Sequence, residues 1–227
     1  MRETRNLKLG VLVLLETLIV GPLGVNCYIV GDEKTREALV IDPGGNARDI
    51  LDTLRREQLR LVAIVATHAH FDHLLALDEI RAATRAPFLL HADEASTLAN
   101  ASLGARLFGF AFRSPAPAER LLREGDAVRI GSLALNVLHT PGHSPGGMCL
   151  LHDKSIFVGD TLFQGGIGRA DLPGGDYGTL MRSIRDKLLT LPDDTVVYPG
   201  HGDATTIGEE RQLNPFLRPL RTGQWEV

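Results

Sequence analysis

The sequence predicts an α/β fold of the α+β type, in which helices cover the sheets. Short apolar runs indicate strands, and segments of helical period lie between them. The strands come in runs near the start and in the middle of the chain, which favours covered sheets over one all-parallel sheet. With 227 residues, 44% of them hydrophobic, and no linker-like stretch, we expect a single domain over residues 1–227.

Eight apolar runs predict strands, and three periodic segments predict helices. The strands are Leu15–Val20, Asn26–Val30, Ala38–Ile41, Leu61–Ala66, Leu133–Leu138, Met148–Leu151, Ile156–Val158 and Thr195–Val197. The first helix is expected to begin at Asn46 as its N-cap, with Asp49 three residues on. The apolar residues of the three helices are Ala47, Ile50, Leu51 and Leu54; Leu74, Leu77 and Ile80; and Leu180, Ile184 and Leu188.

Two segments are predicted to be loops. Residues 100–118 carry Leu107 and three phenylalanines among Gly, Ser and Pro. This apolar loop could cap a site, pack as a satellite core, or form the contact of a homodimer. Residues Gln164–Asp176, with the sequence QGGIGRADLPGGD, are too irregular for a regular element and match no phosphate-cradling motif.

Charge and cysteine content restrict the partners and the compartment. The net charge of −4 and the pI of about 6.1 disfavour a nucleic-acid partner held by phosphate contacts. Cys27 and Cys149 lie in apolar runs, and we expect buried, reduced thiols in a cytoplasmic protein. The apolar run Leu9–Leu15 is ended by Glu16 and is far shorter than the ~20 residues of a membrane span. Residues 1–14 are therefore expected to be a short extension, with no membrane partner.

The stretch Thr67–His73, THAHFDH, is the main candidate for a metal site. It follows the apolar run Leu61–Ala66 directly. Because alternate residues of an extended chain point the same way, His68 and His70 can face one point. Asp72 and His73 would then lie at the turn into the next helix and reach a second point a few ångströms away.

The other candidate ligands follow the same positional rule. Each comes a few residues after a predicted strand and beside a glycine: His143 follows Leu133–Leu138, Asp160 follows Ile156–Val158, and His201 follows Thr195–Tyr198. Rigid strands would fix the ligand geometry, and the glycines would let backbone approach the site. The sequence therefore predicts that these side chains meet at one edge of the sheets.

Five histidines and two carboxylates exceed the needs of one tetrahedral zinc ion, so two metal ions are expected. One ion would take His68, His70 and His143, the other Asp72, His73 and His201, and Asp160 would bridge them. The ions would stand about 3.5–4 Å apart. Imidazole and carboxylate suit zinc, iron and manganese alike, so ligand type does not decide the metal; zinc is the expected ion, with iron or manganese as alternatives. His91, His139 and His152 are expected to be structural: His91 at the opening of a helix, His139 beside the ligand-bearing segment, and His152 in a turn.

The ordered set of H-x-H-x-D-H at 68–73, His143, Asp160 and His201 resembles the metallo-β-lactamase superfamily. The resemblance begins at about Leu15 and covers nearly all of the chain. It implies an αββα sandwich of two mixed sheets flanked by helices, with the metal site in a cleft at one edge. Within the superfamily the chain is most similar to short, glyoxalase-II-like hydrolases, through GPLGVNCYIV (21–30), TPGHSPGG (140–147), GDTLFQGGIGRADLPGGD (159–176) and YPGHGDATTIGEERQLNPFL (198–217).

This resemblance implies a metal-dependent hydrolase of glutathione thioesters such as S-lactoylglutathione. A metal-bridging hydroxide would attack the thioester carbonyl, with Asp72 as ligand and orienting catalytic residue. Arg169 matches a basic position that contacts glutathione in relatives, and Tyr177 and Arg218 are further candidates for substrate contacts.

Other activities of the superfamily stay open at this point. A mononuclear iron persulfide dioxygenase is the first alternative, and a lactonase and a non-catalytic metal-bound interaction domain are the others. β-Lactam hydrolysis is disfavoured because the commonest metallo-β-lactamases have cysteine where Asp160 stands. RNA processing is disfavoured because no added arm is visible.

Overall fold

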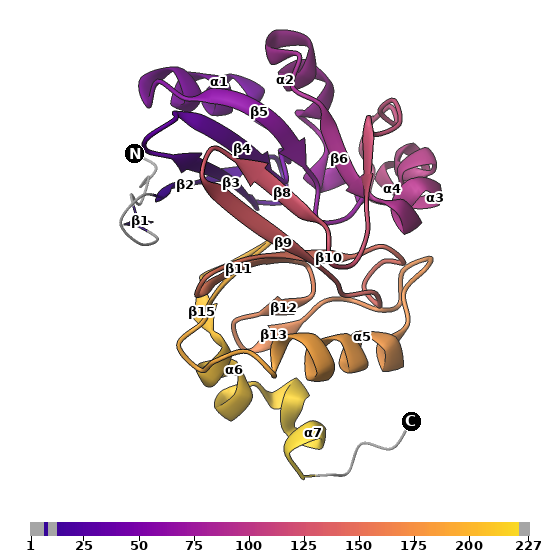
Figure 1. The fold of residues 1–227 in the computed structure, drawn as a ribbon. Helices are drawn as coiled ribbons and strands as arrows, with labels where there is room; N and C mark the ends of the chain where they lie inside the picture. The colour runs from indigo at the N-terminus through magenta and orange to yellow at the C-terminus, as the bar shows by residue number, and fades with distance from the viewer. Residues whose placement is uncertain (1–6, 9–12, 223–227) are drawn as a thin grey trace.

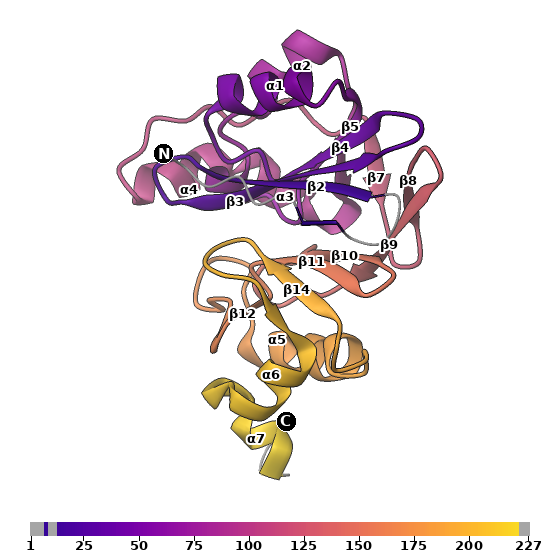
Figure 2. The ribbon, with the colours of Figure 1, turned by 90° about the vertical axis from the view of Figure 1, so that its left-hand side faces the viewer.

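The side chains of strand β3 (Val25–Asp32) show how the layers arise. They alternate between two faces, so that Tyr28 and Val30 pack between the two sheets while Ile29 packs on the other side. A strand that is apolar on both faces has to be covered on both. The result is a helix–sheet–sheet–helix stack, visible in Figures 1 and 2 of the computed structural model, which describes residues 7–8 and 13–222.

The N-terminal sheet has seven strands in sequence order. Neighbouring strands from β1 to β4 are antiparallel, and neighbouring strands from β4 to β7 are parallel. Its strands are β1 (Leu7–Lys8), β2 (Val13–Val20), β3, β4 (Glu37–Ile41), β5 (Arg60–Val65), β6 (Phe88–His91) and β7 (Arg120–Leu122).

The C-terminal sheet has six strands in the order β15-β14-β11-β10-β9-β8, and all neighbours are antiparallel except β11 and β14. Its strands are β8 (Ala127–Ile130), β9 (Leu133–His139), β10 (Met148–His152), β11 (Ser155–Gly159), β14 (Val196–Pro199) and β15 (Thr205–Thr206). A separate two-stranded ribbon consists of β12 (Leu162–Phe163) and β13 (Gly166–Ile167).

Helices cover the outer face of each sheet, α1 and α2 on the N-terminal one and α5 and α6 on the C-terminal one (Figures 1 and 2). The α-helices are α1 (Ala47–Arg56), α2 (Leu77–Thr84), α3 (Ala95–Ala99), α4 (Ala101–Leu107), α5 (Tyr177–Ser183), α6 (Ile207–Leu213) and α7 (Arg218–Thr222). Short 3-10 turns occupy η1 (Phe71–His73), η2 (Ala92–Glu94) and η4 (Pro215–Leu217), and α5 continues as a π-helical turn, η3 (Ile184–Leu188).

Three apolar cores correspond to the three interfaces between the layers. One lies under α1 and α2 and includes Ile50 and Ile80; the middle one lies between the sheets and includes Phe157; the third lies under α5 and includes Leu180. Asp32 joins the two halves, because its buried carboxylate accepts hydrogen bonds from the backbone N–H and hydroxyl of Ser132, at 2.6 Å each. No helix in the described part of the chain is both long and apolar enough to span a bilayer.

The structure confirms the eight predicted strands to within two residues at either end, and it also corrects the predictions. Strands β6, β7, β8, β12, β13 and β15 were not predicted, and β13 lies inside the predicted loop Gln164–Asp176. Residues 1–6 and 9–12 of the expected extension lie outside the described residues, but Leu7–Lys8 pairs with β2, which itself begins at Val13. The predicted loop 100–118 contains helix α4, and the second helix begins only at Leu77.

Two expectations about single residues also need correction. Asn46 holds the N-cap position of α1 with φ of 52°, but its side chain accepts from the Gly21 N–H and donates to Asp49 instead of capping the helix. His91 ends strand β6 and is buried, so it is not a partly exposed helix residue, although the η2 turn does follow it. Cys27 and Cys149 are buried free thiols, as expected, and burial raises the pKa of Cys149 to about 12.

Candidate metal centre

Four strands end beside the predicted metal ligands. Strand β5 of the N-terminal sheet leads to His68 and His70, while β9, β11 and β14 of the C-terminal sheet lead to His143, Asp160 and His201. Asp72 and His73 lie in the η1 turn that follows β5. Both sheets therefore contribute to one cluster at a common edge, which is the arrangement expected from the positions of these residues after strands.

The first group of donors consists of three histidine nitrogens. Nε2 of His143 lies 3.2 Å from Nε2 of His68 and 2.9 Å from Nδ1 of His70. Ligands of a tetrahedral zinc ion with zinc–nitrogen distances of about 2.0–2.1 Å are separated by roughly 3.3 Å. These three nitrogens therefore have the spacing of one metal-binding group.

The second group consists of Asp72, His73 and His201. Oδ2 of Asp72 lies 3.6 Å from Nε2 of His73 and 3.4 Å from Nε2 of His201. The side chain of His73 is fully buried, whereas that of His201 is 29% exposed and borders the cavity. This group therefore faces both the protein interior and the open side of the site.

Asp160 lies between the two groups. Its Oδ2 is 3.7 Å from Nε2 of His143 and 3.7 Å from Nε2 of His201, and its Oδ1 is 3.5 Å from Nε2 of His73. A Cβ at Gly200 would stand 2.2 Å from Oδ1 of Asp160, and a Cβ at Gly168 would stand 1.8 Å from its carbonyl oxygen. Glycine is thus required at both positions for the carboxylate to reach its place.

Unpaired buried atoms show that this cluster suits metal ions. Neither ring nitrogen of His73 has a hydrogen bond of acceptable geometry, although Asp42 Oδ2 lies 3.1 Å from Nδ1, and Asp160 Oδ1 has no partner either. Buried polar atoms without partners are costly. A cation in the cluster would satisfy Nε2 of His73 and Oδ1 of Asp160, and imidazole nitrogen with carboxylate oxygen is a donor set that zinc, iron and manganese accept. The His/Asp cluster is therefore able to bind metal ions.

The pKa values of the histidines differ between the two groups. Burial lowers the pKa of His68 well below its ordinary value and that of His70 to about 4, and neighbouring imidazoles add to both shifts. Burial alone would lower the pKa of His73, but nearby carboxylates, foremost those of Asp72 and Asp160, raise it well above the ordinary value. His68 and His70 are therefore neutral and ready to ligate at neutral pH, whereas His73 would have to exchange a proton for a metal ion.

Hydrogen bonds to the far side of the imidazoles select their tautomers. The Thr67 hydroxyl donates to Asp42 Oδ2 at 2.8 Å, so in its 3.1 Å contact with His68 Nδ1 the histidine is the donor. Nδ1 of His143 donates to the carbonyl oxygen of Arg169 at 2.7 Å. In both histidines Nε2 keeps its lone pair, and it points into the cluster.

Glu94 connects the two segments that carry the first group. Its carboxylate accepts hydrogen bonds from the backbone N–H of Ala69 at 2.9 Å and of Gly146 at 2.7 Å, and it is fully buried. Ala69 separates His68 from His70, and Gly146 follows His143 closely. Glu94 therefore fixes these segments relative to each other.

Asn26 holds the His201 segment in the same way. Its backbone N–H donates to the Gly200 carbonyl at 2.7 Å, and its side-chain amide donates to the carbonyls of Pro199 at 3.0 Å and Gly202 at 2.8 Å. This buried residue of β3 thereby joins the N-terminal sheet to the end of β14.

Sequence reasoning missed Asp42, Glu94 and Asn26. Asp42 is not one of the proposed ligands, but it follows the predicted strand Ala38–Ile41 directly, so the rule that located the ligands could have found it. Glu94 and Asn26 act through contacts to distant backbone, and nothing in their local sequence marks them.

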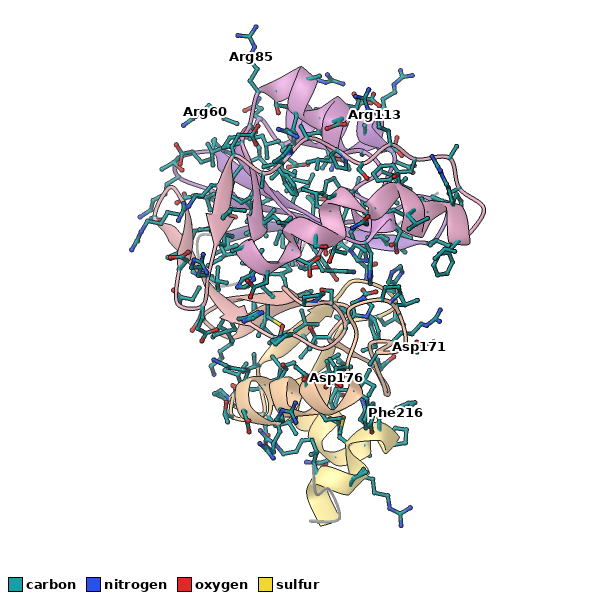
Figure 3. All side chains as sticks on the ribbon, turned by 90° about the vertical axis from the view of Figure 1, so that its right-hand side faces the viewer. Arg60, Arg85, Arg113, Asp171, Asp176 and Phe216 are labelled. Atoms are coloured by element: carbon teal, nitrogen blue, oxygen red, sulfur yellow. The ribbon has the colours of Figure 1, made fainter. Side chains whose placement is uncertain are left out.

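A cavity of about 610 Å³ opens at the cluster and is bordered by His70, Asp72, His143, Asp160 and His201. Arg169 also lines it, and its guanidinium makes a two-pronged ion pair with Asp171 at 2.9 and 2.8 Å. In Figure 3 Asp171 lies on the C-terminal half, whereas Arg113 lies on the N-terminal half.

The described residues that line the cavity do not include Tyr177 or Arg218. Tyr177 begins α5, where the Asp176 cap fixes the helix start, and Arg218 lies on α7.

The remaining histidines lie apart from the cluster. The rings of His91 and His139 are stacked at 4.0 Å, and His139 Nε2 donates to the carbonyl of Pro145 at 3.0 Å. His91 and His139, with Asp93, form a second group with metal-ligand spacing, but both nitrogens nearest Asp93 already have hydrogen-bond partners. His152 ends β10 before a turn and contacts the Ala134 carbonyl at 3.0 Å.

The family model described as metallo-beta-lactamase superfamily matches residues 20–201. The chain belongs to this superfamily. It is 43% identical over 202 residues to a probable metallo-hydrolase, YqgX, of Bacillus subtilis, covering 87% of this chain and 94% of that protein. It is 37% identical over 216 residues to the hydroxyacylglutathione hydrolase GloC of Haemophilus influenzae, covering 89% of this chain and 97% of GloC.

Solved structures of the superfamily share the fold. The crystal structure of BLEG-1 B3 metallo-beta-lactamase has a TM-score of 0.84 at 42% identity, covering 90% of this chain and 99% of that one. The di-iron-bound form of TTHA1623 has a TM-score of 0.81 at 40% identity, covering 88% and 99%. ETHE1 from Myxococcus xanthus has a TM-score of 0.77 at 30% identity, covering 93% and 92%. The αββα prediction is thus confirmed, and the chain is a metallo-hydrolase-type member of the superfamily.

Proposed function

We propose that this protein is a thioesterase that hydrolyses glutathione thioesters such as S-lactoylglutathione with two divalent metal ions. The observation that carries the proposal is the pair of three-donor groups with Asp160 between them, at the mouth of a cavity large enough for a small-molecule ligand. The similarity to the hydroxyacylglutathione hydrolase GloC supports the choice of substrate.

The proposed ligands are those expected from the sequence. His68, His70 and His143 would hold one ion, and Asp72, His73 and His201 would hold the other, with Asp160 placed between the two groups. When bound, the two ions supply a nucleophilic water of lowered pKa and polarise the substrate carbonyl. We take zinc as the most favoured metal, with iron or manganese as alternatives. Between these two alternatives, the similarity to the di-iron-bound form of TTHA1623 supports iron.

The protein's own groups position the reactants. Asp72 borders the cavity and is the proposed catalytic residue, because its carboxylate can accept a hydrogen bond from the attacking water and orient it toward the carbonyl carbon. The departing thiolate is a stable anion, so no strong general acid is needed. Arg169 is the proposed contact for a substrate carboxylate. To make this contact, its guanidinium has to exchange the carboxylate of Asp171 for that of the substrate. The free thiols of Cys27 and Cys149 support a cytoplasmic setting.

The test is hydrolysis of S-D-lactoylglutathione by metal-replete protein, with a chelated sample as control. We expect metal-dependent turnover with kcat in the ordinary range of roughly 1–1000 per second. The same samples are assayed for oxygen uptake with glutathione persulfide, and for hydrolysis of a lactone and of a cephalosporin. The cephalosporin is needed because one similar structure is described as a B3 metallo-beta-lactamase. Turnover of one of these compounds, without turnover of the thioester, would overturn the proposal.

A further inference from the structure

We propose that the cavity beside the cluster is a binding site for an apolar acyl chain, so that the preferred substrates are thioesters of medium-chain acyl groups. This inference rests on the proposed thioesterase activity and deepens it. The acyl chain would lie along the cavity wall while the thiol end points toward solvent.

Apolar side chains from both halves of the molecule form the walls. Helix α4 and the residue after it contribute Leu103, Leu107 and Phe108, whose exposed fractions are 56%, 72% and 45%. The segment that includes the β12–β13 ribbon faces them across the cavity and contributes Phe163, Ile167, Leu172 and Pro173. These three large apolar side chains on one short helical segment are only partly covered within the described chain, and a ligand in the cavity would cover them further.

Phe71 connects this apolar wall to the metal cluster. It lies between His70 and Asp72 in the sequence, and it lines the cavity. Its ring centroid lies 5.8 Å from that of Phe108 and 5.4 Å from that of Phe110. A substrate whose carbonyl carbon lies beside Asp72 would therefore place its acyl chain against Phe71 and Phe108.

The lining offers one cationic side chain for the charged glutathione part of the substrate. Glutathione carries two carboxylates and one ammonium group, and a site for it needs cationic side chains. Of the described residues that line the cavity, Arg169 is the one lysine or arginine, and its guanidinium is already paired with Asp171. Most of the lining is therefore suited to the apolar part of the substrate.

Gly104 offers a way to fill the cavity without disturbing the fold. It lies in α4 and lines the cavity, and an added Cβ would meet no atom within 4 Å. A larger residue is also favourable in a helix, where glycine costs about 1 kcal/mol relative to alanine. Gly104→Phe should therefore fold and occupy the volume proposed for the acyl chain.

The experiment measures kcat/KM for S-lactoyl-, S-butanoyl-, S-hexanoyl- and S-octanoylglutathione, each below its micelle-forming concentration. A buried methylene contributes at most about 0.8 kcal/mol, a factor of about four in kcat/KM. For the unmodified protein we expect kcat/KM to rise along the acyl series by up to fourfold per methylene. Gly104→Phe and Leu107→Asp should each lower kcat/KM for S-octanoylglutathione at least tenfold. In both variants kcat/KM for S-lactoylglutathione should stay within threefold of the unmodified protein. Leu213→Asp is the matched control, because Leu213 is 75% exposed on α6 and does not line the cavity.

The outcomes separate the two proposals. Absence of metal-dependent turnover with every thioester would overturn the thioesterase, and this inference with it. Turnover of S-lactoylglutathione with a flat or falling chain-length series would overturn the acyl site alone. Leu107→Asp could instead keep the chain-length dependence of the unmodified protein and convert a dimer to a monomer in sedimentation. This result would assign the exposed wall to a homodimer contact and would also overturn the acyl site.

Discussion

Replacing Glu94 should loosen the metal site without touching a metal ligand. The buried carboxylate accepts two backbone N–H groups, those of Ala69 and Gly146, and Glu94→Ala leaves both without a partner. An unsatisfied buried donor costs about 1–3 kcal/mol, so two such donors should lower the free energy of unfolding by about 3 kcal/mol. Glu94→Gln keeps one acceptor oxygen and should cost roughly half as much.

The assay is urea unfolding of chelated protein followed by circular dichroism, because metal binding would otherwise obscure the difference. Glu79→Ala, an exposed change on α2, is the control and should stay within about 0.5 kcal/mol of the unmodified protein. Zinc affinity, measured by competition with a chromophoric chelator, should fall about 10–100-fold in Glu94→Ala because the His143 segment is no longer fixed. A Glu94→Ala protein as stable as the Glu79→Ala control would refute the reasoning.

Three further predictions follow from individual contacts. Asp160→Asn, which removes the charge of the carboxylate between the two donor groups, should weaken the second metal most; unchanged metal content by mass spectrometry would exclude the bridging role. Arg169→Ala should raise KM for S-lactoylglutathione several-fold. Metal content should change little, because His143 contacts only the backbone carbonyl of residue 169. An unchanged KM would show that the Arg169 side chain does not bind the substrate. Hydrogen bonds, foremost from Ser132, hold the pKa of Asp32 well below its ordinary value of 3.8. The ionised carboxylate therefore stabilises the folded protein above pH 3.8, and this contribution is lost as the pH falls below 3.8. Asp32→Asn should therefore cost about 2 kcal/mol at pH 7 and progressively less below pH 4 in urea unfolding, and a pH-independent difference would contradict this account.

The strand-end rule explains why so much of the cluster could be predicted from sequence. Long apolar runs such as Leu61–Ala66 identify strands locally, and polar residues just beyond them must lie near one edge of the sheet. The same rule should have included Asp42, which follows Ala38–Ile41. The rule fails for Glu94, because its role depends on contact with Gly146, 52 residues away.

The missed strands have a different cause. Strands β6 and β7 have only four and three residues, and they exist because parallel neighbours supply their hydrogen bonds. Such pairing leaves no periodic pattern within so short a run. Helix α4 was missed because Gly104 lowers the local helix propensity, whereas packing of the following phenylalanines against Phe71 holds the segment in place.

Counting bound metal ions and turnover in the same samples tests whether two metal ions at this site support hydrolysis of the thioester. Chelated protein is titrated with zinc, iron or manganese, and bound metal per chain and hydrolysis of S-D-lactoylglutathione are measured at each point. We expect binding that saturates at two ions per chain, with turnover that rises as the ions bind. Turnover in the metal-free sample, or two bound ions with no turnover for any of the three metals, would contradict it.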